Sequence, residues 1–255
     1  MRKIALTGVV AAAVVAAACG GKTASPAPRA AAAGATVVVR HCTAGARRRL
    51  GTRDFAVAAL AVRPTAAFRE PAQTLLARFG LKNVNGAPTV FGVLGERLDS
   101  SCRPTWLHVQ LPMRPNGVTG WIHAADVETA KVYTRIVVDL SERRVRFYRR
   151  GRLVLSSRAA VGSSATPTPL GRYYVNQRLI PSDRNGPFGP GAVGISAFSP
   201  VLTGWAQGGP IAIHGTNQPW SIGHSVSNGC IRLPNAVLQR LFAATPAGTP
   251  VIIRS

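Results

Sequence analysis

Short segments in which apolar and polar residues alternate recur along most of the chain, and this two-residue period indicates half-buried β-strands. Within WLHVQLPMRPNGVTGWIHAADV, residues 106–127, Leu107 and Val109 flank His108, and the Pro-Asn-Gly turn predicts a hairpin. The apolar or alternating segments are residues 37–39, 55–62, 89–94, 106–111, 120–122, 135–140, 144–148, 152–157, 172–177, 211–214 and 250–254. The pattern therefore predicts a mainly β protein.

Helical patterns occur in only two places. The first is a short helix expected at residues 73–79. The second begins at Pro234 and Asn235 and ends near Pro246, and its apolar stripe consists of Val237, Leu238, Leu241 and Phe242. Before it, the Gly- and Pro-rich segment 181–194 is long enough to be a functional loop that borders a substrate cleft.

A length of 255 residues predicts two modest domains plus a non-globular segment. Residues 19–36 are rich in small residues and carry nothing that would enter a core, so we expect a flexible tether there. We place a first, small β domain at residues 37–130. The second domain, at residues 131–255, is expected to be mainly β with one short helix.

The first eighteen residues predict export. Met1-Arg2-Lys3 gives a positive start, and the apolar run at 4–18 is too short to span a bilayer as a mature helix. The run ends in Ala-Ala-Ala-Cys-Gly and resembles the lipobox of bacterial lipoproteins, which implies a lipid-modified Cys19 as the first mature residue. The alternative is ordinary Ala-x-Ala cleavage with Cys19 nearby by chance. Both interpretations export the protein, and the first anchors it to the outer face of the cytoplasmic membrane.

The formal charge of +22 raises nucleic acid as a partner. Export argues against that partner, and the arginines are scattered apart from clusters at 47–49 and 143–152. A solvated basic surface that faces anionic lipid and anionic wall polymer accounts for the charge, and salt is expected to weaken that attraction. We therefore expect no nucleic-acid partner.

Three cysteines remain once Cys19 is set aside, which is an odd number for an oxidising compartment. Cys42 and Cys102 both lie in the first half of the chain, so a disulfide between them is favoured, although sequence does not prove the connectivity. The alternative is a zinc site with His41, but the short paired ligand spacing of such sites is missing. The favoured pairing leaves Cys230 as a free thiol.

Residues 89–127 resemble a bacterial SH3-like domain. The strand, the Pro-Asn-Gly turn, the Gly-Trp-Ile strand and the terminal Ala-Asp-Val carry the resemblance. It implies a small β domain and says little about function. His108 and His123 are single residues on a sheet face, so we expect them at the surface or in packing contacts and not as metal ligands.

The free thiol at Cys230 follows His214 by sixteen residues, in the stretch IAIHGTNQPWSIGHSVSNGCIRLPN. A cysteine nucleophile needs an imidazole or backbone amides to favour its anion, and His214 supplies the imidazole. Gly229 allows a sharp turn in which consecutive amides face an incoming carbonyl. This set favours acyl transfer; the alternative is an inert, buried cysteine beside a structural histidine.

The segment IHGTNQPWSIGHSVSNGCIRL resembles the motif of the L,D-transpeptidases, or YkuD family, in which His-Gly-Thr precedes Ser-His-Gly-Cys-Ile-Arg. The resemblance extends to TPTPLGRYY and to the strands from Arg135 onward. By position it implies that Cys230 is the nucleophile, that His214 is its base, and that the Gly215 carbonyl orients the imidazole. It also implies an oxyanion hole at the amides of Gly229 and Cys230.

The same resemblance suggests residues that bind substrate. Arg232 stands at the arginine of Cys-Ile-Arg and suits a substrate carboxylate, although an arginine paired to a structural acid is the alternative. The other candidates are Thr216, Ser227 and Asn228. The sequence has Asn228 where the motif has histidine, and His224 is expected to be a solvent-facing loop residue rather than its substitute.

The resemblance implies a cysteine-dependent peptidoglycan L,D-transpeptidase that acts on stem peptides as donor and acceptor. Hydrolysis at the same site would make an L,D-carboxypeptidase, and a wall-binding lipoprotein without activity is the contrasting class. A cysteine protease acting on proteins is disfavoured because its cysteine environment is missing. We expect a monomer without cofactor or metal.

Overall fold

The structure is a computed structural model that describes residues 42–255. The predicted signal peptide, the tether, the lipid-bearing Cys19 and the strand at 37–39 lie outside the described residues. Within the described part of the chain, no helix is both long enough and apolar enough to cross a membrane. The fold is mainly β with one α-helix among these residues, as predicted.

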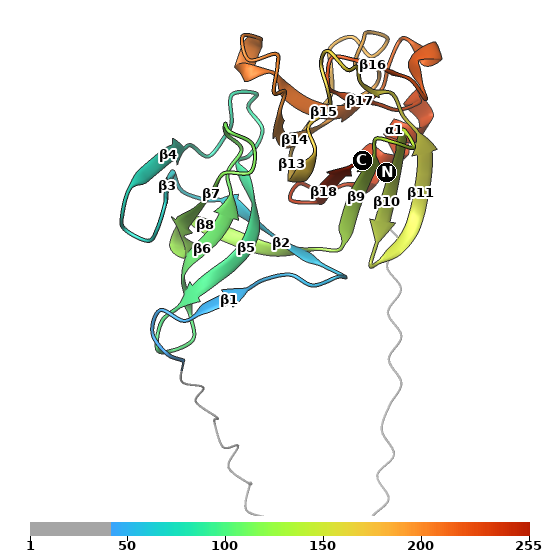
Figure 1. Cartoon of the computed structure of the whole chain (residues 1–255). Helices are drawn as coiled ribbons and strands as arrows, with labels where there is room; N and C mark the ends of the chain where they lie inside the picture. Colours follow the sequence, from blue (N-terminus) through green and yellow to red (C-terminus); the bar gives the residue numbers. More distant parts are fainter. Residues whose placement is uncertain (1–41) are drawn as a thin grey trace, which may run out of the picture. The chain divides into compact units, whose positions relative to one another are not determined.

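The first half of the chain forms an eight-stranded antiparallel sheet (Figure 1). Its order is β4-β3-β7-β6-β5-β2-β8, and β1 pairs with β5. Its core is made by alternate residues such as Phe91, Leu107, Val109 and Ile122, which are fully buried. The strands are β1 (Arg47–Arg49), β2 (Ala56–Ala61), β3 (Thr65–Phe68), β4 (Leu75–Phe79), β5 (Val90–Leu98), β6 (Pro104–Gln110), β7 (Thr119–His123) and β8 (Val127–Val132), with a short 3-10 helix η1 (Ala124–Asp126).

The predicted helix at 73–79 is wrong, because β4 occupies Leu75–Phe79. This strand pairs antiparallel with β3, and the ring of Phe79 packs edge-on against Phe91 at 5.1 Å between centroids. An isolated helix of seven residues is too short to be stable, so the pairing with β3 decides the local structure. The predicted hairpin is confirmed: β6 and β7 pair antiparallel on either side of the Pro-Asn-Gly turn.

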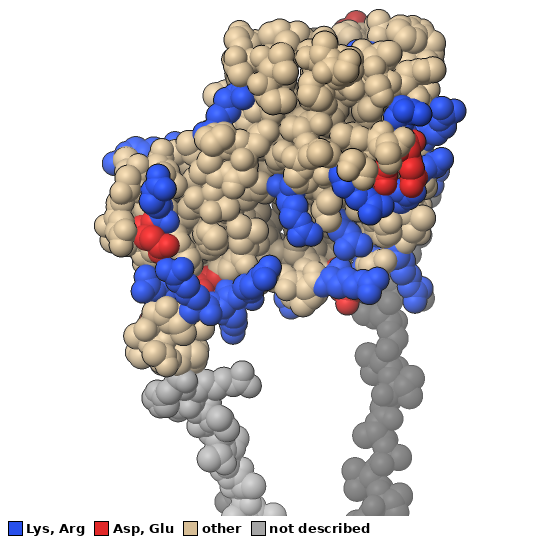
Figure 2. Space-filling model, in the orientation of Figure 1, with Lys and Arg blue, Asp and Glu red and all other residues tan. Residues whose placement is uncertain are grey.

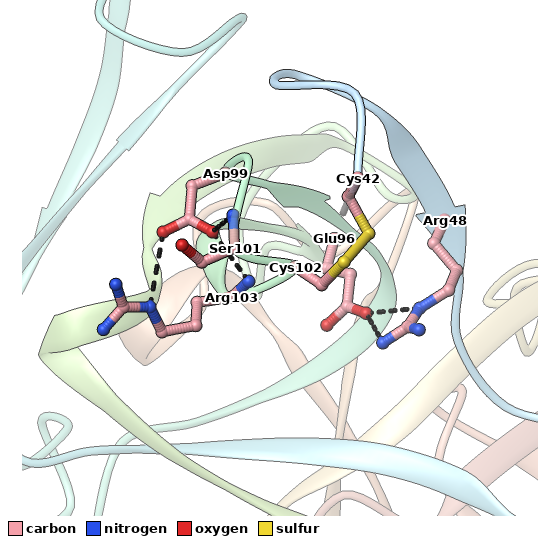
Figure 3. Close-up of a disulfide and its surroundings, with 7 residues drawn as sticks. All are labelled: Cys42, Arg48, Glu96, Asp99, Ser101, Cys102 and Arg103. Atoms are coloured by element: carbon pink, nitrogen blue, oxygen red, sulfur yellow. Dashed lines mark hydrogen bonds and ion pairs between the residues drawn. A yellow bond between two sulfur atoms is a disulfide. The ribbon is translucent and has the colours of Figure 1, made fainter. Parts of the chain in front are cut away.

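Cys42 and Cys102 form a disulfide that links residues 60 positions apart (Figure 3). Beside it, Arg48 on β1 forms an ion pair with the buried carboxylate of Glu96 on β5. Asp99 accepts hydrogen bonds from the amides of Ser101 and Arg103, both at 2.8 Å, and so closes the turn that carries Cys102. The pairing is the one that the sequence favours, and Cys230 is a free cysteine.

The second half forms another eight-stranded sheet in the order β11-β10-β9-β18-β13-β14-β15-β17, and β12 pairs with β16 separately. Its strands are β9 (Thr134–Asp139), β10 (Arg144–Arg149), β11 (Arg152–Arg158), β12 (Val161–Gly162), β13 (Gly171–Leu179), β14 (Ala192–Phe198), β15 (Pro210–His214), β16 (Ser225–Ser227), β17 (Ile231–Arg232) and β18 (Pro250–Arg254). The 3-10 helices are η2 (Ala206–Gly208) and η3 (Pro219–Ser221), and the α-helix is α1 (Asn235–Ala244).

Helix α1 is the predicted short helix after the cysteine. It buries Leu238 and Leu241 in a core shared with strand residues such as Ile213 and Ile231. Pro234 is its N-cap residue and makes no side-chain cap. Asn235 does not cap the helix either: its Oδ1 atom accepts a hydrogen bond from the Thr216 amide at 2.8 Å. The helix therefore ties the loop after β15 to the core.

Two boundaries differ from the sequence prediction. The loop predicted at 181–194 ends earlier, because β14 begins at Ala192 and pairs with both β13 and β15. The first sheet continues to Val132, two residues past the predicted domain end, because β8 pairs along the whole length of β2. In both cases pairing between strands distant in sequence sets the limit.

The described residues, 42–255, belong to one compact unit. Within it, the turn after β6 contacts the connection between β14 and β15. Arg114 donates hydrogen bonds to the carbonyls of Ser199 and Gly208, and its guanidinium lies over the ring of Phe198 at 5.5 Å. Asn116 exchanges two hydrogen bonds of 2.8 Å with the main chain of Phe198. The first sheet thus holds the segment that leads into β15.

Candidate active site

The predicted base, His214, ends β15, and the predicted nucleophile, Cys230, directly precedes β17, the neighbouring parallel strand at the edge of the second sheet (Figure 1). His214 is the last residue of β15 and pairs in register with Arg232 of β17. Cys230 directly precedes β17. Its sulfur accepts a hydrogen bond from the Ala212 amide at 3.4 Å, two residues before His214. The fold therefore brings Cys230 against the strand that carries His214.

His214 is buried, with 4% of its surface exposed. Its Nδ1 atom lies 2.6 Å from the Gly215 carbonyl, and because a carbonyl only accepts, Nδ1 carries the proton and Nε2 keeps a lone pair. The ring also contacts Phe188 edge-on at 4.9 Å. Burial lowers the pKa of His214 to about 4; the Gly215 hydrogen bond opposes this shift and the positive charge of Arg232 adds to it. The imidazole is therefore a neutral base at neutral pH.

The Cys230 thiol is half-buried. Burial raises its pKa, and the Ala212 N–H and the positive charge of Arg232 lower it in part. The sulfur also lies 4.0 Å from the Pro210 carbonyl. Because the pKa of His214 is lowered and that of Cys230 is raised, both side chains are neutral at neutral pH.

The turn before Cys230 is held by hydroxyl groups. Ser227 Oγ donates to the Cys230 carbonyl at 2.6 Å and accepts from the Gly229 amide at 3.2 Å. Thr168 Oγ1 donates to the Gly229 carbonyl at 2.8 Å, and Thr166 Oγ1 donates to the Ser227 carbonyl at 3.0 Å. The sequence analysis gave no role to the two threonines, although their TPTPLG segment belongs to the family resemblance.

Two glycines fit the positions where the motif has them. Gly229 has a φ of 107°, a conformation that L side chains rarely adopt, and a Cβ there would meet Ile211 at 3.0 Å. At Gly215 a Cβ would collide with Asn235 Oδ1 and would lie 2.7 Å from Pro190. Close packing at both positions therefore leaves no room for a side chain, and glycine is required there.

The two amides of the predicted oxyanion hole differ. The Gly229 amide is engaged by Ser227 Oγ. Among the described residues, the Cys230 amide has no hydrogen-bond acceptor. The Cys230 amide is therefore the donor that is free to meet a substrate oxygen, and the Gly229 amide would first have to leave Ser227.

Arg232 forms no ion pair with an acid among the described residues. Its guanidinium donates to Gln218 Oε1 at 2.7 Å, and its Nε atom is buried without a partner. The alternative of an arginine paired to a structural acid is thus not what the structure shows. The charge stays available next to the thiol.

The remaining predicted substrate-binding residues separate into two kinds. Thr216 and Ser227 are buried, at 5% and 1% exposure, and their hydroxyls bond the protein's own main chain. Asn228 is exposed, and its side chain makes no hydrogen bond within the described residues. His224 is exposed, as predicted. Asn228 is therefore the one of the three whose side chain is exposed.

Histidines outside the site pack on aromatic rings. His108 stacks on Trp121 with 4.9 Å between ring centroids, and His123 lies 3.7 Å from Trp106. Burial lowers the pKa of His108. Within residues 42–255, no group of three or more His, Cys, Asp or Glu residues is placed to hold a metal ion.

Known proteins resemble the second half of the chain. Residues 133–253 match the family model of the L,D-transpeptidase catalytic domain, YkuD. The Bacillus licheniformis protein YkuD, which carries an L,D-transpeptidase name, is 40% identical over 119 residues, or 47% of this chain and 64% of that protein. The protein of the same name from Bacillus subtilis is 40% identical over 94 residues, which are 37% of this chain and 49% of that protein. The chain thus spans less than two thirds of these relatives.

Solved structures also resemble the chain. L,D-transpeptidase 3 from Mycobacterium tuberculosis has 19% identity and a TM-score of 0.39, covering 56% of this chain and 76% of that one. The catalytic domain of the Enterococcus faecium L,D-transpeptidase has 27% identity and a TM-score of 0.36, and the match covers 48% of this chain and 96% of that one. Residues 133–253 are therefore similar to the L,D-transpeptidase catalytic domain, and His214, Gly215, Gly229 and Cys230 stand at the motif positions.

Proposed function

We propose that the protein is a peptidoglycan L,D-transpeptidase that works through a thioester on Cys230. The observation that carries the proposal is the arrangement on β15. A neutral imidazole with its Nδ1 proton fixed by the Gly215 carbonyl ends the strand against which the Cys230 sulfur lies. A thiol with a raised pKa needs such a base to become a nucleophile.

In the acylation step, the Cys230 sulfur bonds to the carbonyl carbon between an L-centre and a D-amino acid, and its proton passes to Nε2 of His214. The carbon–nitrogen bond then breaks, and the leaving amine takes that proton. In the second step, the amine of another stem attacks the thioester and gives its proton to His214. The carbon–sulfur bond breaks and the thiol re-forms.

Charge stabilisation in this scheme comes from two groups. The Cys230 amide donates to the oxyanion, joined by the Gly229 amide once Ser227 releases it. The Arg232 guanidinium, which no acid of the described chain neutralises, binds a carboxylate of the stem peptide. Asn228 contacts substrate from the exposed side of the turn.

Exposure of the purified protein to a carbapenem, followed by intact-mass measurement, tests the nucleophile. We expect a stable adduct on Cys230 and none in Cys230→Ser. Incubation with a stem tetrapeptide and an amine acceptor then separates the outcomes: a cross-linked product supports the transpeptidase, while release of the free tripeptide alone indicates an L,D-carboxypeptidase. Absence of both adduct and thiol reactivity would favour a wall-binding protein without activity.

The proposed location is the outer face of the cytoplasmic membrane, with lipid on Cys19 and residues 19–36 as a tether that reaches the wall. The support is the sequence pattern of residues 1–20. Growing cells with a labelled fatty acid tests it: label is expected on the wild-type protein and is expected to be lost in Cys19→Ser. An unlabelled protein whose first residue lies beyond Cys19 would contradict the anchor.

We assign an SH3-like module to residues 37–130. The antiparallel sheet of short strands and the β6–β7 hairpin support this assignment. In this assignment, Arg114 and Asn116 of the module hold the connection between β14 and β15.

A further inference from the structure

A cavity of about 380 Å³ opens between the two sheets, away from the candidate active site. It is lined by the segment from Arg49 to Val57, by parts of β5 and β6, and by residues of β9, β10, β13 and β18. None of the proposed catalytic residues lines it. A volume of this size lies within the range of small-ligand pockets.

The lining carries positive charge that the protein does not neutralise. Arg49, Arg53, Arg135 and Arg172 line the cavity, and Asp54 is the only acidic residue among the lining residues. None of these four arginines forms an ion pair within residues 42–255. Figure 2 shows blue Lys and Arg side chains along the lower part of one face of the molecule, with few red ones. An anion that enters the cavity therefore meets four arginines, and only one carboxylate of the lining competes with it for them.

An aromatic ring, not an acid, holds one of the lining arginines. Arg135 lies over the ring of Tyr148 at 4.9 Å, and both residues line the cavity. Two other lining rings also carry cations: Arg150 lies over Tyr133 at 5.2 Å and Lys131 lies over Phe55 at 4.8 Å. A cation–π contact fixes a guanidinium in place and leaves its charge uncancelled. The arginine is thus positioned for an anion in advance.

Two buried polar groups on lining residues lack partners. The Nε atom of Arg135 and the hydroxyl of Tyr174 are both buried without a hydrogen bond in the described structure. The Tyr174 residue is only 2% exposed, and its ring packs on Gly92 so closely that a Cβ there would lie 2.9 Å away. A buried donor without a partner costs free energy, so the protein's own groups do not fully satisfy the polar atoms of the lining residues.

The chemistry of the lining defines the ligand. Guanidinium groups bind carboxylates in a fork, so the ligand carries at least one carboxylate. Val57, Val93 and Val251 give the cavity an apolar wall, which a purely polar anion would not use. We propose that this cavity binds a short peptide with free carboxylates. The choice of a peptidoglycan stem as that peptide rests on the proposed function.

Calorimetric titration with a stem tetrapeptide tests the proposal. The protein is first alkylated at Cys230 with iodoacetamide, so that the result does not depend on catalysis. Arg172→Gln and Arg135→Gln are each expected to weaken binding about tenfold, since each removes one charge-assisted contact. The matched control is Arg152→Gln, an exposed arginine of β11 outside the cavity, which is expected to bind as the wild type does. Arg172 is exposed, so its variant is expected to fold even if Arg135→Gln does not.

Two probes identify the ligand chemistry. A tetrapeptide with its carboxylates amidated is expected to bind at least tenfold more weakly, and inorganic phosphate at the same concentration is expected not to displace the peptide. The proposal is overturned if no binding is seen, if both cavity variants bind normally, or if the amidated peptide or phosphate binds equally well. Carbapenem acylation reports separately on the proposed function, so the two ideas fail independently.

Discussion

Arg114, in the turn after β6, donates a hydrogen bond of 2.6 Å to the main-chain carbonyl of Ser199, which lies just after β14. The same NH2 group reaches the Gly208 carbonyl at 2.5 Å. One side chain of the first sheet thus closes both ends of the connection that enters β15, the strand that carries His214. The first half of the chain therefore helps to fix the position of the strand that carries His214.

Arg114→Ala is expected to slow acylation of Cys230 by a carbapenem about tenfold. Loss of both hydrogen bonds loosens residues 199–208, and with them the Pro210 end of β15. The acylation rate of Arg114→Lys is expected to lie between those of the wild type and of Arg114→Ala, because lysine keeps the positive charge but lacks the planar guanidinium. The control is Arg63→Ala, an exposed arginine in the turn between β2 and β3. An Arg114→Ala protein that acylates at the wild-type rate would refute the coupling.

Thr168→Val is expected to reduce the acylation rate about tenfold and the free energy of unfolding by about 2 kcal/mol. The change removes the hydroxyl that accepts from the Gly162 amide and donates to the Gly229 carbonyl, and leaves both buried main-chain groups without partners. Thr168→Ser keeps the hydroxyl and serves as the control. Rates by mass spectrometry, set beside urea unfolding, check both effects. Equal behaviour of the Val and Ser variants would rule out the proposed support.

His214→Ala is expected to lower acylation by about 100-fold to 10,000-fold, which is the usual effect of losing a general base. Asn228→Ala is expected to cost far less, within about tenfold, because its exposed side chain makes no hydrogen bond in the described residues. Asn228→His restores the motif residue and is expected to be near neutral. Acylation rates with one β-lactam, with Cys230→Ser as the blank, measure all three. If Asn228→Ala is as inactive as His214→Ala, the division of roles is wrong.

The acylation rate is expected to stay level from about pH 5 to pH 8 and to fall at lower pH as His214 takes up a proton. Burial places the His214 pKa at about 4, below its ordinary value of 6.5, so the neutral base persists well into the acid range. Burial raises the pKa of the Cys230 thiol above its ordinary value, so free thiolate contributes little to the rate in this range. Rates over this range, with circular dichroism to confirm folding, give the profile. An acid limb centred near pH 6.5 would contradict the burial argument.

Reduction of the disulfide is expected to lower the free energy of unfolding by about 4 kcal/mol in the chain-entropy model, because the bridge closes a loop of 60 residues. Urea unfolding of the wild type and of a Cys42→Ser, Cys102→Ser double variant measures this loss. The midpoint of the double variant should not change when a reductant is added. Peptide mapping that finds Cys230 in a bridge would overturn both the pairing and the nucleophile.

The sequence predicts those parts of the site that a local pattern encodes. His214 and Cys230 stand in a motif whose spacing survives in the chain, and alternation marks the long strands. Alternation cannot reveal β17, which is only two residues long and exists through its pairing with β15. The strand at Leu75–Phe79 was missed for the same reason, since its partner β3 decides its conformation.

Contacts between segments far apart in the chain could not be predicted from the sequence either. Thr168 and Gly229 lie 61 residues apart, and Arg114 lies 85 residues from Ser199. Neither pair has a local pattern that joins it, because such contacts depend on how whole strands are ordered in a sheet. The tautomer of His214 was expected from the family resemblance, but its low pKa follows mainly from burial, with a contribution from Arg232, and needs the fold.

Strand β18, the last of the chain, lies in the middle of the second sheet between β9 and β13. It runs parallel to β9, and the Arg254 carbonyl accepts a hydrogen bond from the Leu140 amide at 2.8 Å. Until residues 250–254 have left the ribosome, β9 to β11 remain separate from β13, β14, β15 and β17, and both pieces have open edges. The segment around Cys230 therefore joins a complete sheet only after residues 250–254 have been made, and deletion of these residues would divide the second sheet in two.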